Sequence, residues 1–193
     1  MSLNVMLILE DYRKDQYIIV PIIRKMFEAL GKPRANVRPC MDPLIGGINQ
    51  ALDWSELQNV IARYQMYDLF LLIVDRDGEE TRCKKLERLE SESQKKFPSK
   101  AFLAEHAWQE IEVWALAGQK DLPSVWRWPE IRAERDPKER YFKPYADTRG
   151  LENEPGEGRT TLGKEAALNY HRVRTLCPED IGRLEERIRS CLN

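Results

Sequence analysis

The sequence predicts an α/β domain with a mainly parallel, four-stranded, Rossmann-like sheet that is flanked by helices and followed by a mostly helical, irregular extension. Two observations lead to this class. Up to about residue 118, short apolar runs alternate with segments whose apolar residues recur every three or four positions. Beyond residue 118, prolines and turn-rich stretches such as "ENEPGEGR" become frequent. We therefore expect an α/β domain over residues 1–118 and an extension over residues 119–193 that packs on it.

The first half of the chain predicts two strands and two helices. Residues 3–9 are mostly apolar and end at Glu10, which suits a strand buried on both faces of a parallel sheet. Apolar residues recur at helical spacing over residues 15–30, and a glycine and a proline soon after them mark the helix end. Residues 36–40 predict a short strand before a loop rich in proline and glycine. A second helix is expected over residues 53–65.

The second half predicts the remaining elements of the sheet and its last helix. Residues 69–74 form an uninterrupted apolar run and predict a buried strand. The charged residues 79–96 predict a helix that lies largely in solvent, with Leu86 and Leu89 as its few apolar anchors. A fourth strand is expected over residues 101–105, followed by a helix over residues 108–116. The chain ends in an expected helix over residues 178–192.

Composition limits the classes of protein to consider. Lys and Arg total 31 against 32 Asp and Glu, so the net charge of -1 provides no general attraction to nucleic acid or to an anionic membrane. The four cysteines form no CxxC pair, so neither a zinc site nor a disulfide framework is indicated. The longest apolar run is too short to span a bilayer, and no secretory signal precedes it. We expect a soluble cytoplasmic protein without a membrane partner.

Acidic residues follow two of the expected strands. Glu10 follows the first strand, and Asp75 and Asp77 follow the strand over residues 69–74, with Gly78 permitting a tight turn. In open parallel sheets the ligand site forms at the carboxyl ends of the strands. Gathered carboxylates raise one another's pKa unless a cation neutralises them. Because Mg²⁺ binds few protein carboxylates and leaves positions for water and phosphate, the pattern indicates a metal site for phosphate chemistry.

These motifs resemble the Toprim domain that topoisomerases, primases, ribonuclease-maturation enzymes and OLD-type nucleases share. "MLILED" resembles the strand that ends in the motif glutamate, and "LLIVDRDG" resembles the later strand with its DxD pair. Within this group the chain is most similar to small bacterial Toprim-like proteins of the OLD-nuclease and abortive-infection type. "HAWQEIEVWALAG" resembles their QExExWLLA segment, and the late "CP" dipeptide resembles their C-terminal region.

The resemblance implies roles for individual residues. Glu10 takes the acid/base or metal role, and Asp75 and Asp77 hold Mg²⁺ or Mn²⁺, so that these three residues form the catalytic set. Glu110 and Glu112 match the additional acidic positions that complete a second metal site. As helical neighbours at i and i+2 these two side chains would not share a helix face, so at least one is expected to point elsewhere.

The residue after the motif glutamate departs from the family pattern. Many members have glycine there, whereas this chain has Asp11, so either the loop is tighter or Asp11 itself contributes to the site.

The extension carries the candidate substrate contacts. Basic residues concentrate there, and Lys143, Arg159 and Lys164 are candidates for binding substrate phosphates. The alternative is that these cations belong to ordinary solvated helix faces. Trp126 and Trp128 would offer a stacking platform for bases or, alternatively, pack within the protein.

Taken together, we expect a Mg²⁺- or Mn²⁺-dependent phosphodiesterase, a Toprim-type nuclease in which water attacks a nucleic-acid phosphate. The resemblance further implies a role in bacterial defence or DNA repair beside a separate ATPase partner, since the chain has no GxxxxGK[ST] loop. One alternative is a non-catalytic Toprim-like scaffold that binds a partner protein or nucleic acid. Another is a phosphoacceptor domain, which needs an acceptor Asp and a later Lys that the sequence does not place. The choice between DNA and RNA stays open.

Overall fold

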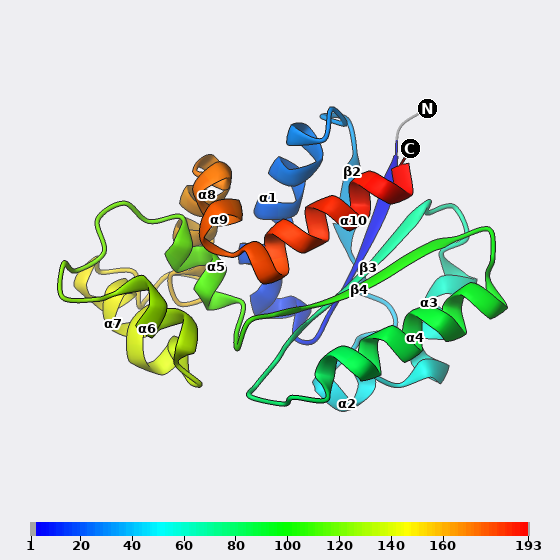
Figure 1. Cartoon of the computed structure of the whole chain (residues 1–193), viewed down its shortest axis with the longest axis horizontal. Helices are drawn as coiled ribbons and strands as arrows, with labels where there is room; N and C mark the ends of the chain where they lie inside the picture. The colour runs from blue at the N-terminus through cyan, green and yellow to red at the C-terminus, as the bar shows by residue number, and fades with distance from the viewer. Residues whose placement is uncertain (1–2, 193) are drawn as a thin grey trace.

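Four parallel strands form one sheet in the order β2-β1-β3-β4 in the computed structural model, which describes residues 3–192 (Figure 1). The strands are β1 (Asn4–Leu9), β2 (Asn36–Pro39), β3 (Leu69–Asp75) and β4 (Ala101–Ala107). Every pairing is parallel, and the register places Leu9 of β1 beside Ile73 of β3. The predicted α/β class with a parallel four-stranded sheet is confirmed.

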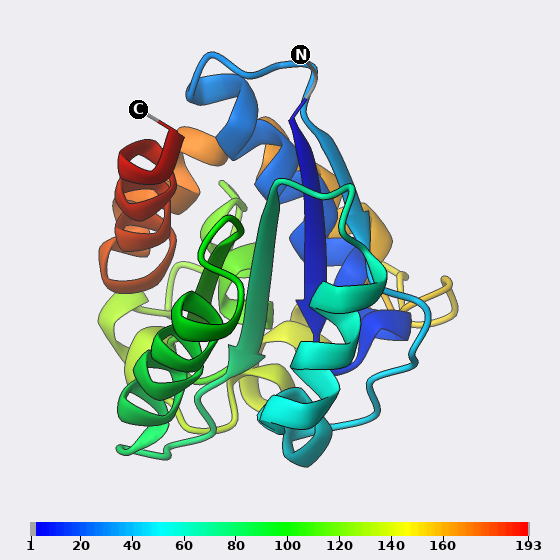
Figure 2. The same ribbon diagram turned by 90° about the vertical axis from the view of Figure 1, so that its right-hand side faces the viewer.

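Helices cover both faces of the sheet because its two central strands are apolar on both sides. Alternate residues of β1 enter different hydrophobic clusters, Leu7 on one face and Ile8 on the other. The first face is covered by α1 (Tyr12–Ala29), and the second by α3 (Trp54–Arg63) and α4 (Arg82–Lys96). In Figure 2, α3 (cyan) and α4 (green) lie in front of the strands.

The order of the strands creates a switch point at the centre of the sheet. The chain leaves β1 through α1 toward one edge strand, β2, and leaves β3 through α4 toward the other, β4. The carboxyl ends of β1 and β3 therefore lie side by side with connections that diverge from them. Open parallel sheets bind their ligands at such a point, because the diverging connections leave a crevice.

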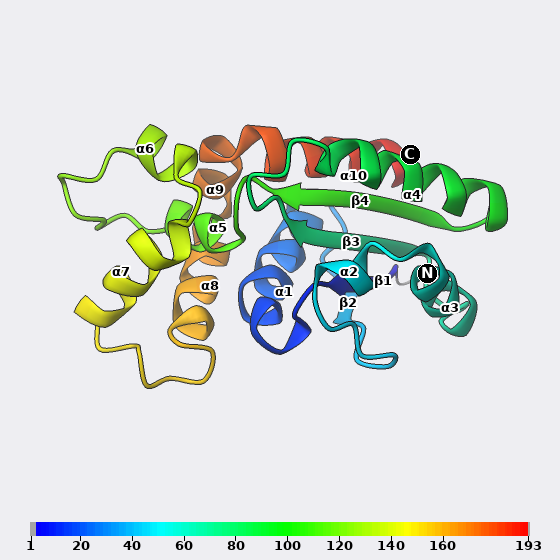
Figure 3. The same cartoon turned by 90° about the horizontal axis from the view of Figure 1, so that it is seen from below.

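The extension lies beyond the carboxyl ends of the strands. Figure 3 shows α5 to α9 gathered at that end, while α10 returns along β4. The remaining elements are α2 (Ile48–Ala51), α5 (Glu112–Ala117), α6 (Trp128–Ala133), the π-helical turn η1 (Lys138–Phe142), α7 (Lys143–Thr148), α8 (Arg159–Leu168), α9 (Tyr170–Leu176), the π-helical turn η2 (Pro178–Gly182) and α10 (Arg183–Leu192). Leu184 and Ile188 of α10 join the same hydrophobic cluster as α1, so the extension shares one core with the sheet.

Close contact between α8 and α1 depends on a glycine. A Cβ atom at Gly163 would lie 2.2 Å from the carbonyl oxygen of Tyr17 and 2.8 Å from Cα of Ile18. Gly118 has the same role beside Ala166, whose Cα would lie 2.2 Å from an added Cβ. These two glycines let the helix backbones approach one another, and α8 thereby holds the extension against the start of α1.

The structure differs from the sequence-based expectations in several element boundaries. The helix expected over residues 108–116 begins only at Glu112, as α5. The helix α4 exposes most of its residues, as expected, and it packs against β4 through the buried Leu86, Leu89 and Ser93. The strand β4 runs to Ala107, two residues beyond its predicted end, since Ala107 pairs with Asp75. The short α2 and the π-helical turns were not predicted. Within residues 3–192, no helix is both long and apolar enough to cross a membrane.

Candidate metal centre

Gln109 joins the loops that follow β3 and β4. Its carbonyl oxygen accepts hydrogen bonds from the backbone N–H groups of Arg76 (2.8 Å) and Asp77 (3.1 Å). Its side-chain Oε1 accepts a third from the N–H of Gly78 (2.9 Å). Asp77 (φ 53°) and Gln109 (φ 72°) both adopt left-handed backbone conformations, which are uncommon for residues other than glycine. Such conformations persist only where the surroundings hold them, and they concentrate at functional sites.

The joined loops bring three carboxylates together. One oxygen each of Asp75, Asp77 and Glu110 lies within 4.8 Å of the others. Asp75, the last residue of β3, accepts a hydrogen bond from the N–H of Ile111 (2.9 Å). Glu110 accepts one from the N–H of Lys138 (2.8 Å) in the extension. Asp77 lies in the turn between them and is exposed. Both predicted DxD aspartates and one of the two later glutamates therefore meet in one place.

Glu10 lies beside this group but outside it. It follows β1, the neighbour of β3, and its Oε2 is buried without a hydrogen-bond partner among the described residues. Burial raises the pKa of Glu10, and the charge of Asp77 raises it further, while the backbone of Asp75 acts in the opposite direction. The acid at the end of β1 and the pair at the end of β3 are thus electrostatic neighbours, as their strand ends predict.

The carboxylates at this point are too many for all of them to stay charged without a cation. Burial raises the pKa of Asp75 well above its ordinary range, and the charge of Glu112 is the next cause. Burial likewise raises the pKa of Glu110 and of Asp15, in the first turn of α1, to about 7. The groups whose charges raise the pKa of Asp75 are Glu112, Asp15, Glu10 and Asp77. Without a cation the site takes up protons, and a bound metal ion would relieve the same repulsion.

Glu112 lies near the three carboxylates, but its own carboxylate is paired with an arginine. Its carboxylate accepts a hydrogen bond from the guanidinium of Arg159, and the side chains are only 4% and 3% exposed. Arg159 also donates to Glu157 (3.1 Å) and to the carbonyl of Gly156 (3.1 Å). Arg159 therefore neutralises Glu112 inside the protein instead of offering a surface contact to substrate as we expected. Glu112 is outside the three-carboxylate group, because its carboxylate is engaged at the start of α8.

Glu110 and Glu112 do not lie on the same helix, contrary to our expectation. The helix α5 begins at Glu112, so Glu110 precedes it and the helix-face argument does not apply to this pair. Glu110 stays at the end of β4 beside Asp75, whereas Glu112 points to α8 from the first position of the helix.

No family model, curated protein or solved structure matches this chain. The resemblance to Toprim domains therefore rests on the motifs around Glu10 and Asp75 and on the order of the elements. The functional roles that it implies stay predictions.

Three residues of the site escaped sequence reasoning. Asp15 lies in the first turn of α1, Arg82 begins α4 with its Nη2 3.7 Å from Oδ2 of Asp77, and Gln109 is a single amide before Glu110. All three lie in segments that look ordinary in sequence. Asp11, which we considered as a further ligand, is the N-cap of α1 and accepts a hydrogen bond from the N–H of its second following residue (3.1 Å). Its own N–H donates to Asp15 (2.9 Å).

The expected substrate cations and the tryptophan platform have local partners. Lys143 on α7 forms an ion pair with Glu139 (2.6 Å), and Lys164 lies exposed on α8. Trp126 packs against the ring of Tyr141 with centroids 5.0 Å apart, and Trp128 donates from its indole N–H to a carbonyl (2.9 Å). Several other cations of the extension form ion pairs within it: Arg132 with Asp180, Arg140 with Glu134 and Arg149 with Glu165. The tryptophans serve packing, and the roles of the two lysines stay predictions.

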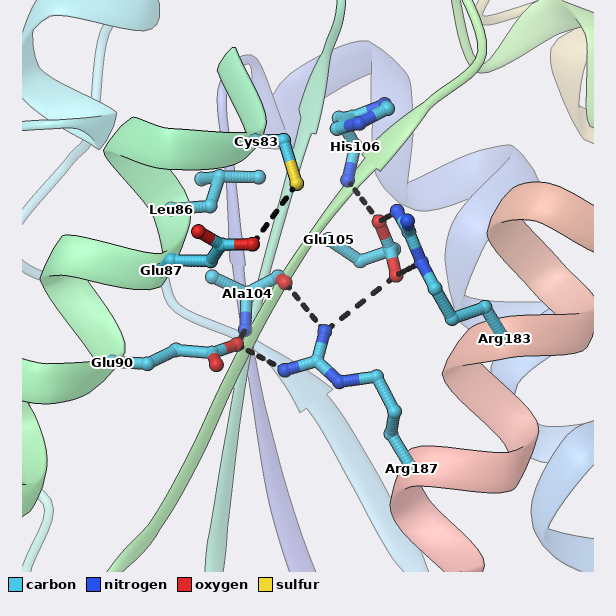
Figure 4. A pocket seen from close by; sticks show the side chains of 9 residues that line it. All are labelled: Cys83, Leu86, Glu87, Glu90, Ala104, Glu105, His106, Arg183 and Arg187. Carbon is cyan, nitrogen blue, oxygen red and sulfur yellow. Dashed lines mark hydrogen bonds and ion pairs between the residues drawn. The ribbon is translucent and has the colours of Figure 1, made fainter. Parts of the chain in front are cut away.

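Away from the acidic site, a cavity of about 260 Å³ lies between α4, β4 and α10 (Figure 4). The charged side chains that line it hold α10 against the sheet. The buried carboxylate of Glu105 on β4 pairs with Arg183 and Arg187 of α10. Arg187 also donates to the carbonyl of Ala104 (2.9 Å), whose N–H donates to Glu90 (2.6 Å). Side chains thus satisfy backbone groups of the edge strand and tie α10 to it, which protects the edge from pairing with another chain.

Proposed function

We propose that the protein is a nuclease of Toprim type, in which Asp75, Asp77 and Glu110 hold Mg²⁺ or Mn²⁺ for the hydrolysis of a nucleic-acid phosphodiester. The observation that carries the proposal is the convergence of these three carboxylates at the switch point of the sheet. Their donor atoms are all oxygen, which is the ligand type that Mg²⁺ and Mn²⁺ prefer.

The residues fit such an ion on three counts. A divalent cation would balance carboxylates whose pKa values are raised by burial and by one another. The left-handed backbone at Asp77 and Gln109 holds the ligands in place before any ion arrives, so little reorganisation is needed. The buried Oε2 of Glu10 has no partner among the described residues, so it is free to accept a hydrogen bond from a water molecule.

The chain's own residues have distinct parts in this proposal. A bound divalent ion supplies charge for the phosphoryl oxygens and lowers the pKa of a coordinated water. Glu10, with its raised pKa and unpartnered oxygen, accepts the proton of the attacking water. Arg159 neutralises Glu112 inside the protein, so that one carboxylate fewer must be balanced by the metal.

The biological setting follows from the resemblance alone. We infer a cytoplasmic protein that acts in bacterial defence or DNA repair beside a separate ATPase, because the chain has no phosphate-binding loop of the GxxxxGK[ST] type. The same proposal includes contacts of Lys143 and Lys164 with the phosphates of the nucleic acid.

The deciding experiment compares the wild type with Asp77→Asn. Labelled single- and double-stranded DNA and RNA are incubated with each protein and Mn²⁺ or Mg²⁺. We expect Asp77→Asn to lower the activity by roughly 10- to 100-fold or more. Even residues that only hydrogen-bond to metal ligands contribute roughly that much, and Asp77 is a proposed ligand itself. Asp147→Asn, on the exposed side of α7, is the matched control and should cleave like the wild type. Equal products from the wild type and Asp77→Asn would reject this site.

Metal binding is measured on the same proteins. A ligand that binds only the native state raises the melting temperature, so Mg²⁺ should stabilise the wild type more than Asp77→Asn. A metal-dependent shift without cleavage of any substrate would favour the non-catalytic scaffold. No shift in the wild type would remove the metal site from the proposal.

A further inference from the structure

Arg82 is a buried cation whose guanidinium is incompletely hydrogen-bonded by the residues that the structure describes. It is the first residue of α4, and its side chain is 7% exposed. Its Nη2 lies 3.7 Å from Oδ2 of Asp77, which is too long for a hydrogen bond. Its Nε is buried and has no hydrogen-bond partner within residues 3–192. A buried guanidinium nitrogen without a partner is costly, since its N–H has left water without a replacement acceptor.

Arg159 shows what a structural arginine looks like in this same site. It is buried to a similar degree, and its Nε likewise lacks a partner among the described residues, yet its terminal nitrogens donate to Glu112, Glu157 and a backbone carbonyl. Arg159 is therefore explained by the protein's own acids. Among residues 3–192, the ion-pair contact of Arg82 is the long one to Asp77, an acid that the proposed metal would also use.

The surroundings of Arg82 indicate which ligand would supply the hydrogen-bond acceptors that its guanidinium lacks. Its charge lowers the pKa of Glu10 and of Glu79, so it lies near the acids at the ends of β1 and β3. A second guanidinium, that of exposed Arg135, lies over Gly78 in the turn that carries Asp77, with its Nε 3.4 Å from where a Cβ would be. Two arginines beside a proposed metal site favour an anion with several acceptor oxygens, and phosphate matches the guanidinium fork.

We propose that Arg82 binds a non-bridging oxygen of a substrate phosphate beside the cation held by Asp75, Asp77 and Glu110. This inference rests on the proposed function and deepens it, because it assigns recognition of a phosphate group to a residue outside the acidic motif. The bound phosphate supplies the hydrogen-bond acceptors that Arg82 lacks, while the metal takes over the charge of Asp77.

A purely structural role for Arg82 predicts different behaviour. If Arg82 served only as a counter-ion of Asp77, its removal would destabilise the metal-free protein and tighten Mg²⁺ binding, and phosphate affinity would stay unchanged. As a phosphate ligand, Arg82 contributes to phosphate affinity itself. Because it has no short hydrogen bond to a described residue to lose, Arg82→Gln should fold with a melting temperature close to that of the wild type.

The test is calorimetric titration of inorganic phosphate into the Mg²⁺-loaded protein. We expect Arg82→Gln to weaken phosphate binding roughly tenfold or more, since a charge-assisted hydrogen bond is lost. Arg82→Lys keeps the charge but loses the fork, so its affinity should fall between the two. Arg88→Gln, exposed on the same helix, is the control and should bind phosphate like the wild type. Equal phosphate affinity in the wild type and Arg82→Gln, or no phosphate binding by the wild type, overturns the inference.

Titration of Mg²⁺ alone separates this inference from the proposed function. If the wild type binds Mg²⁺ but its phosphate affinity does not depend on Arg82, only the role of Arg82 is wrong. If the wild type binds no Mg²⁺, the metal site is wrong, and phosphate is then titrated into the metal-free proteins. Weaker binding by Arg82→Gln in that case still supports a phosphate site at Arg82, and equal binding rejects it.

Discussion

Replacing Asp15 by asparagine should make the metal-free protein more stable near neutral pH and leave it nearly unchanged in acid. Asp15 lies in the first turn of α1, where burial and the charges of Glu112, Asp11 and Glu10 raise its pKa to about 7. Its carboxylate accepts a hydrogen bond from the N–H of Asp11 (2.9 Å). An asparagine carbonyl oxygen accepts the same bond, so the substitution removes the charge and little else.

The sign and size of the effect follow from the raised pKa. A carboxyl group that holds its proton more tightly in the folded than in the unfolded state contributes stability below its ordinary pKa of 3.8, and this contribution is lost as the pH rises to about 7. The loss amounts to about 4 kcal/mol for this difference in pKa. Asp15→Asn has no such loss. Relative to the wild type it should therefore gain up to about 4 kcal/mol between about pH 4 and pH 7, or about 8–16 °C in melting temperature.

The assay is guanidinium unfolding followed by tryptophan fluorescence, at a series of pH values and with a chelator present. The measured quantity is the free energy of unfolding of Asp15→Asn minus that of the wild type at each pH. Asp147→Asn, exposed on α7, should give a difference close to zero throughout. Adding Mg²⁺ near pH 8 should shrink the difference for Asp15→Asn, because a bound cation lowers the pKa of the neighbouring acids.

A difference that stays constant from acid to neutral pH would refute the reasoning. It would mean that Asp15 is ionised in the folded protein at no cost, and that the acids at the ends of β1 and β3 do not repel it. A loss of stability in Asp15→Asn as the pH rises would refute it more strongly, since the sign would be reversed.

Two further predictions concern how the extension holds the site. Asp180 is buried and accepts hydrogen bonds from Arg132 (3.1 Å), from the indole of Trp114 (2.7 Å) and from the N–H of Trp108 (2.9 Å) near Glu110. Asp180→Ala should lower the free energy of unfolding by about 3–5 kcal/mol, because it removes the acceptor of both tryptophan N–H groups and leaves buried Arg132 with only the half-exposed Glu179 as its ion-pair partner. Adding Arg132→Met should restore part of this loss, since the poorly compensated guanidinium is then gone. Denaturant unfolding of both variants measures the effect, and a loss below about 1 kcal/mol would contradict it. Gly163→Ala places a Cβ against the backbone of α1 and should lower the free energy of unfolding by about 1–3 kcal/mol. Leu168→Ala, on the exposed side of α8, should lower it little. Equal melting temperatures of these two variants would contradict the close contact between α8 and α1.

Local patterns in the sequence are sufficient for the strands and the acids that follow them. The apolar run over residues 69–74 is too short for a buried helix and too apolar for a solvated strand, so it predicts an interior strand. Strand ends in a parallel sheet carry the ligand site, so the sequence pattern alone places Glu10, Asp75 and Asp77 at one edge. The α/β class follows from the alternation of the two periodicities, and the structure confirms it.

The concentration of basic residues in the extension led to a wrong prediction for Arg159. Arg159 looks like a free surface cation in sequence, because its acidic partner Glu112 is far away along the chain. The charges of α4, by contrast, correctly predicted a helix that is largely in solvent, and its few apolar residues, Leu86 and Leu89, bury the remaining side against the sheet.

The sequence by itself determined which segments become strands and which of them end in acids, since periodicity and strand ends are properties of neighbouring residues. Tertiary structure alone decided that β1 lies beside β3, that Gln109 joins the two loops, and that Asp15 and Arg82 lie among the acids. The reason is that carboxylate repulsion and the burial of a guanidinium depend on distances of a few ångströms between residues remote in sequence. Those distances are set by how the helices pack, and no local pattern encodes them.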